Sequence, residues 1–249
     1  MPEAVGTNQI DQLMERASEA LGAGAYFDAH TLCGRALAKA RAGNDFDRMA
    51  RICLPMQEAA RWIRQTAEEE GVKGVLSSSA ELRKSPAAGC YLLRPPMVAL
   101  DAATFRDSAW RRKVPVFIIA REPMTQAGEW PVAAVGPSKL HGMLTVRTKV
   151  APPPGVLATG HGITRDEMVG LPPVEWMVHA GEALGNAAMA RVDPNDPAAW
   201  RVDDLLEYLA AIPEHEKLHQ RLADECRNAE NEPPPSQPRR AKDANPLSF

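Results

Sequence analysis

The chain has 249 residues, of which 45% are hydrophobic and 24% charged, so it is long enough to bury a core without disulfides or metal ions. Its net charge of -3 excludes the general basic surface that nucleic-acid-binding proteins carry. The four cysteines have no CxxC spacing, and the first residues carry no secretory signal, so we expect a cytoplasmic protein. No window approaches about 18 uncharged apolar residues, so we expect no membrane span.

Three amphipathic helices are predicted over residues 10–65, after a loose lead at residues 1–8. In each helix the apolar residues recur at intervals of three and four, as they do on one buried helix face. Glycines follow the first two patterns and favour helix ends there. Pro55 lies inside the third pattern and removes a backbone donor, so it predicts a kink or a split at that point.

Small and aromatic residues recur at helical spacing in the middle of this stretch, at Gly24, Tyr26, Ala29, Cys33, Ala36 and Leu37. This pattern resembles the turn and second helix of a tetratricopeptide repeat, although Arg16 and Ala20 depart from it in the first helix. The resemblance covers one repeat plus one helix, fewer than the three units that a solenoid needs. It implies a helical surface for a protein partner, and the alternative is a helical cap on the rest of the chain.

Residues 72–88 are rich in Gly and Ser and are predicted to be a linker, with room for one short helix at Ala80–Lys84. The pattern then changes to that of an α/β domain over residues 89–230. Its strands are predicted at residues 90–93, 114–120, 130–135 and 144–150. A helix at 101–112 separates the first two strands, which predicts a βαβ unit in a small mixed sheet of about four strands. The unalternated apolar run at 114–120 indicates a strand buried on both faces.

Three more helices are predicted at the C-terminal end, over residues 174–191, 197–212 and 214–230. Residues 231–249 are rich in proline, with basic residues among them, and are expected to be disordered. The predicted fold class is therefore mixed α and β. A helical unit at residues 1–71 precedes an α/β domain that includes the C-terminal helices.

The segment His215-Glu216-Lys217-Leu218-His219 matches the pattern H-E-x-x-H. Two histidines four residues apart lie on one helix face and can hold zinc, while the glutamate acts on the bound water. Lys217 departs from the uncharged residues of similar zinc peptidases, and only carboxylates follow as third ligands. The motif therefore indicates either a zinc site with Glu216 as the catalytic residue, or a helix whose apolar side chains face the core.

Arg94 and Arg121 each follow the carboxyl end of a strand in the βαβ unit. Ligands of open α/β sheets bind at that edge, and arginine is suited to carboxylates and phosphates. The first strand is followed by Arg94-Pro95-Pro96 and not by a glycine-rich phosphate loop. The two interpretations are a site for a small anionic ligand and a pair of solvated arginines.

A polar loop, Thr159 to Gly170, contains His161 between two glycines and is either a carrier of a catalytic histidine or a simple turn.

Taken together, these patterns favour an interaction or scaffold protein that needs no cofactor and contacts a protein partner through its N-terminal helices. An enzyme is less favoured. The alternatives are a zinc-dependent hydrolase at His215 and His219, and an α/β domain that binds an anion at Arg94 and Arg121.

Overall fold

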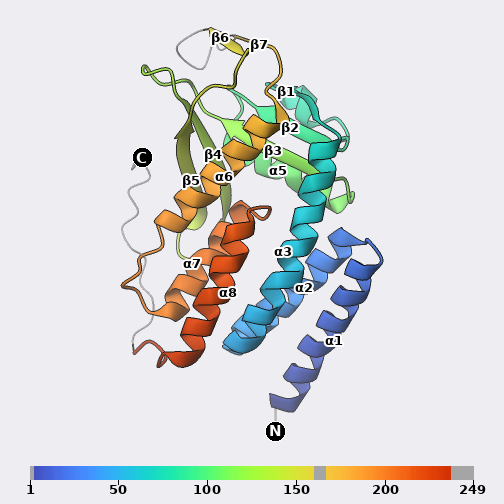
Figure 1. The fold of residues 1–249 in the computed structure, drawn as a ribbon, viewed down its shortest axis with the longest axis vertical. Coiled ribbons are helices and arrows are strands. Elements are labelled where there is room, and N and C mark those ends of the chain that lie inside the picture. Colours follow the sequence, from blue (N-terminus) through green and yellow to red (C-terminus); the bar gives the residue numbers. More distant parts are fainter. Residues whose placement is uncertain (1–2, 160–166, 237–249) are drawn as a thin grey trace. The chain divides into compact units, whose positions relative to one another are not determined.

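The computed structural model describes residues 3–159 and 167–236 of the chain (Figure 1). Its fold is mixed α and β, as predicted. The backbone divides into two compact units. Within the described residues, the helical unit comprises 3–63, 192–209 and 213–236, and the sheet unit comprises 64–159, 167–191 and 210–212.

The helical unit is formed by α1 (Glu3–Gly22), α2 (Tyr26–Ala42), the first part of α3 (Phe46–Glu69), most of α7 (Ala198–Ala211) and α8 (Glu216–Asn231). α1 and α2 pack side by side as a hairpin and contain the tetratricopeptide-like pattern. The buried stripe of α2 is the predicted one, Ala29, Leu32, Cys33, Ala36, Leu37 and Ala40. Because four of these side chains are Ala or Cys, the neighbouring helix can approach closely.

Two local expectations for these helices are wrong: the loose lead at residues 1–8, and the split that was one of the two alternatives at Pro55. α1 begins at Glu3, so the lead predicted at residues 1–8 is helical from its third residue. α3 is one helix that continues through Pro55 and is not split there. Pro55 removes a single donor, while Ile52 and Met56 on either side of it are buried. Their burial stabilises both halves of α3 in one helix.

The division into units also differs from the sequence-based domains. α7 and α8 were assigned to the α/β domain, but most of α7 and all of α8 belong to the helical unit with α1 and α2. Their buried residues include Leu205, Leu218 and Leu222. Helical spacing in a sequence shows that a face is apolar, but it does not show which core that face joins.

The sheet unit contains five strands in the order β1-β2-β3-β4-β5. They are β1 (Val72–Leu76), β2 (Gly89–Leu93), β3 (Val116–Arg121), β4 (Trp130–Ser138) and β5 (Gly142–Val150). The first three strands are parallel, and β4 and β5 are added antiparallel. The other elements are α4 (Ser79–Leu82), α5 (Ala99–Arg111), α6 (Val174–Ala190) and the antiparallel pair β6 (Leu157–Thr159) and β7 (Glu167–Val169).

The βαβ prediction is confirmed, because β2 and β3 are parallel and α5 connects them. The linker predicted at residues 72–88 contains the strand β1, which was not predicted, whereas its predicted short helix corresponds to α4. β1 is one of the two edge strands of the sheet, and Leu76 is its one buried residue. Because so little of β1 is buried, the strand has no continuous apolar run. The glycines and serines around it therefore dominate the sequence pattern of residues 72–88.

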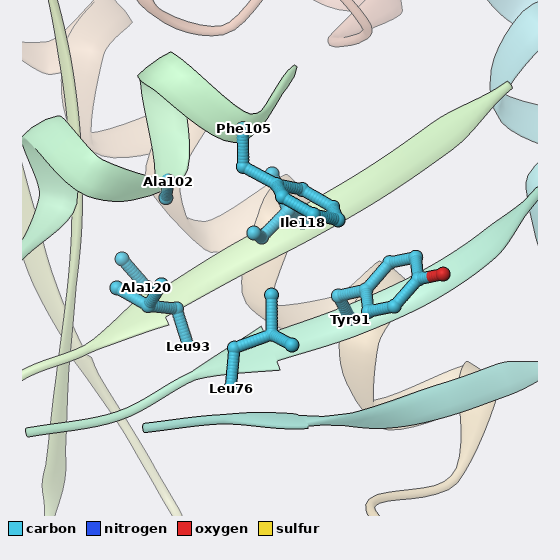
Figure 2. Packing of buried hydrophobic residues seen from close by; sticks show 7 residues of the cluster. All are labelled: Leu76, Tyr91, Leu93, Ala102, Phe105, Ile118 and Ala120. Atoms are coloured by element: carbon cyan, nitrogen blue, oxygen red, sulfur yellow. The ribbon is translucent and has the colours of Figure 1, made fainter. Parts of the chain in front are cut away.

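The central strands β2 and β3 are buried on both faces. Figure 2 shows one face, where Leu93, Ile118 and Ala120 lie with Tyr91 against α5; the rings of Tyr91 and Phe105 meet edge to face at 5.1 Å. The alternate residues of β3 face α6, where a Cβ added at Gly181 would lie 2.8 Å from the ring of Phe117. This two-sided burial explains the unalternated apolar run in β3.

Gly136 of β4 provides a test of this packing. A Cβ added there would lie 2.7 Å from the backbone N of Ala211, so the Gly136→Ala variant requires a backbone shift. We expect a loss of about 1–3 kcal/mol in the free energy of unfolding. The matched control is Gly74→Ala in β1, where an added Cβ meets no atom within 4 Å. Thermal unfolding followed by circular dichroism measures both, and equal midpoints for the two variants would contradict the packing.

Candidate functional site

The two arginines of the anion-site hypothesis lie at the same sheet edge but in different surroundings. Leu93 is the register neighbour of Ala120, so Arg94 and Arg121 follow neighbouring positions. Arg121 is 1% exposed, and its guanidinium lies 4.3 Å from the ring centroid of Trp130. Its Nη1 also donates to the carbonyl oxygen of Glu122 at 3.3 Å. Arg94 is half-buried, so the two side chains differ greatly in their access to a ligand.

The H-E-x-x-H segment lies at the very beginning of α8: His215 immediately precedes the helix, and Glu216 to His219 form its first turn. His215 is the N-cap residue, with φ -84° and ψ 109°, and its Nδ1 accepts a hydrogen bond from the backbone N–H of Leu218 at 3.3 Å. Nε2 of His219 lies 2.9 Å from the carbonyl oxygen of Pro213, and since a carbonyl only accepts, Nε2 donates. The carboxylate of Glu216 accepts from Nε2 of Gln57 at 3.3 Å. The backbone at the helix start therefore binds one ring nitrogen of each histidine.

In the two described stretches of the chain, no group of three or more His, Cys, Asp or Glu side chains could hold a metal ion. His161 and its flanking glycines lie outside the described residues, as do residues 237–249 of the predicted disordered tail. Across the helices that are described, none has the length and apolar character needed to cross a membrane.

Two histidines of the helical unit have strongly lowered pKa values. The pKa of His219 is lowered from 6.5 to about 4, mainly by burial and to a smaller extent by the charge of His215, against the opposing effect of the hydrogen bond to Pro213. Burial, together with the charge of His219, lowers the pKa of His30 to about 3. Both rings are therefore neutral at pH 7 in the folded protein.

This neutrality predicts a loss of stability in acid. Below about pH 6.5 the unfolded chain takes up protons that the buried rings of His30 and His219 do not, so the free energy of unfolding falls as the pH decreases toward 4. At about 1.4 kcal/mol for each pKa unit, His219 alone accounts for a loss of roughly 3 kcal/mol in the free energy of unfolding in acid. In His219→Gln, whose amide can still donate to Pro213, the urea-unfolding free energy should depend less on pH. The exposed His141→Gln control should keep the original profile, and a flat wild-type profile between pH 7 and 4 would refute the assignment.

A cavity of about 770 Å³ lies within the helical unit. Its walls come from the turn between α2 and α3, the first turns of α7, the end of α8 and the residues that follow α8. We call it the proline-lined cavity, and its lining residues are Arg41, Asn44, Phe46, Ala199, Trp200, Asp203, Ala229, Glu230, Glu232, Pro233, Pro234, Pro235 and Ser236.

One wall of the proline-lined cavity is held by an ion pair between α2 and α7. Nε and Nη2 of Arg41 donate to the two carboxylate oxygens of Asp203, both at 2.8 Å. The guanidinium of Arg41 also lies 5.6 Å from the ring centroid of Phe46. A two-point pair of this kind fixes the orientation of both side chains. Arg41 is therefore preorganised, with a flat face against an aromatic ring.

Another part of the lining is anchored by Glu232, the residue that precedes the three prolines. Its Oε2 accepts from the backbone N–H of Ala198 at 2.8 Å, and its Oε1 lies 3.5 Å from Nη2 of Arg201. Nε of Arg201 donates to the buried carboxylate of Glu225 on α8 at 2.8 Å. These bonds join α8 to the N-terminus of α7, so Pro233 begins at a fixed position.

The Arg201–Glu225 pair yields a stability prediction. Arg201→Met leaves the Glu225 carboxylate buried beside its remaining partners, and we expect it to lower the free energy of unfolding by about 3 kcal/mol. The double variant Arg201→Met, Glu225→Met removes both charges and should lose less than the single one. The control is Arg227→Met, which breaks the exposed pair with Asp224 and should cost at most about 0.5 kcal/mol. Chemical denaturation measures all three, and a single variant as mild as the control would exclude a buried pair.

Sequence reasoning did not identify the proline-lined cavity. A helix-borne tryptophan such as Trp200 has the residue type of a core, and Arg41 and Asp203 are ordinary helix charges 162 positions apart. The one local signal is the run of prolines directly after the last helix.

No protein-family model, curated protein or solved structure matches this chain. Its function is therefore argued from the geometry of the described residues.

Proposed function

We propose that this chain is a protein–protein interaction protein whose helical unit binds an extended segment of a partner in the proline-lined cavity. The cavity carries the proposal, because its volume of about 770 Å³ is within the roughly 300–1,000 Å³ that is usual for binding sites. Trp and Arg are the residues that contribute most binding energy at protein interfaces. Trp200 and Arg41 both line this cavity, and Trp200 is half-buried.

The character of the walls supports binding over catalysis. The lining residues include no histidine, cysteine or lysine, and their one hydroxyl belongs to the exposed Ser236. Asp203, a carboxylate in the wall, is held by Arg41 through both oxygens. The proposal keeps the expected contact through the N-terminal helices, and places it at the turn between α2 and α3, together with α7 and the end of α8.

Panning a random peptide library on the full-length protein tests this function without assuming the partner's chemistry. We expect enriched peptides whose binding weakens at least tenfold in Trp200→Ala, because the aromatic wall is lost. A second variant, Ser236→Trp, fills the exposed edge of the cavity without altering a buried residue and should have the same effect.

The matched control is Leu54→Ala, which removes an exposed hydrophobic side chain of the same unit outside the cavity lining and should leave binding unchanged. Circular dichroism verifies that each variant is folded. The proposed function is wrong if no peptide is enriched, or if the enriched peptides bind Trp200→Ala and Ser236→Trp as tightly as the original chain.

A further inference from the structure

We infer that the partner segment held in the proline-lined cavity is an extended peptide that contains proline and carries Arg or Lys. This inference rests on the proposed function and specifies its ligand. Three observations lead to it: the charge of the lining, the character of the walls, and the chain's own residues beside the cavity.

The lining carries an excess of negative charge. Asp203, Glu230 and Glu232 contribute three carboxylates against the one guanidinium of Arg41, a formal balance of -2. Arg41 pairs with Asp203, and Arg201 lies beside Glu232, so the excess is located mainly at Glu230. Glu230 is exposed at the end of α8. A cationic side chain of the ligand is therefore attracted to that end of the cavity, and an anionic one is repelled.

The walls suit proline rings. Trp200 supplies half-buried aromatic surface and Phe46 a buried ring, and the main chain itself lines the cavity with Pro233, Pro234 and Pro235. Glu232 has φ -96° and ψ 147°, so the chain leaves α8 close to the polyproline II conformation. A ligand in that conformation is already extended and loses little conformational entropy on binding, which is why aromatic-lined grooves recognise such segments.

The sequence that follows the cavity has the same chemistry. Gln237-Pro238-Arg239-Arg240-Ala241-Lys242 comes directly after Ser236, a lining residue. It combines proline with three cationic side chains, as the acidic lining requires. Residues 233–242 therefore provide a probe of the inferred ligand class, and the occupant that we assign is a segment of this class from a partner protein.

Fluorescence anisotropy with the full-length protein tests the ligand class. The probe is a fluorescein-labelled peptide with the sequence of residues 233–242. Two matched peptides replace either its prolines by alanine or its three basic residues by glutamate. We expect each replacement to weaken binding at least tenfold, and the charge reversal Glu230→Lys in the protein to do the same for the unaltered probe. Asp224→Lys, on the same helix but outside the lining, is the control and should change affinity less than twofold.

Three outcomes would overturn the inference. The first is equal binding of all three peptides, and the second is unchanged affinity in Glu230→Lys. The third is a gain of at least tenfold in probe affinity when Arg239, Arg240 and Lys242 of the protein are all replaced by glutamate, because the chain's own segment would then be the occupant in place of a partner.

The panning experiment separates this inference from the proposed function. If the enriched peptides lack proline and basic residues but depend on Trp200 and Ser236, the ligand class is wrong and the proposed function stands. If no peptide, selected or synthetic, responds to either variant, both are wrong. Selected peptides rich in proline and arginine that lose affinity in Glu230→Lys support both.

Discussion

The buried ion pair between Arg201 of α7 and Glu225 of α8 is the interaction on which the geometry of the proline-lined cavity depends. Charges removed from water are tolerated only when they are fully hydrogen-bonded. Glu225 also accepts from Asn228 at 3.0 Å and pairs with Arg221 at 2.5 Å. Burial alone would raise the pKa of Glu225, but these partners together with Arg201 keep it below its usual value. Because the bonds are directional, they set how α8 meets α7, and therefore where the proline run begins.

At the start of α8, polar side chains that the H-E-x-x-H motif would assign to a zinc site instead form hydrogen bonds with backbone groups. The first N–H groups of a helix have no partner within it. His215 satisfies one of them as the N-cap residue of α8, and His219 donates to the carbonyl oxygen of Pro213 just before the helix. Arg121 is a parallel case in the sheet unit, where Trp130 and a backbone carbonyl surround its guanidinium. In each case a side chain that resembles a ligand-binding group contacts its own fold.

The predicted elements that matched the structure have strong local periodicity. The elements that were missed or predicted wrongly have no such periodicity. The helices at 174–191, 197–212 and 214–230 correspond to α6, α7 and α8, and the strands β2 to β5 were all anticipated. β1 was missed because an edge strand with one buried residue has no apolar run. Pro55 suggested a break because its local effect was considered without the burial of Ile52 and Met56.

By itself, the sequence determined the mixed α and β class, the βαβ unit and most helix positions, since each depends on the spacing of neighbouring residues. Only the tertiary structure decided that α7 and α8 join the unit of α1 and α2, and that Arg41 meets Asp203 beside Phe46 and Trp200. The physical reason is that a cavity is made by contacts between segments far apart in the chain. Its residues, taken singly, have the types expected on any helix surface.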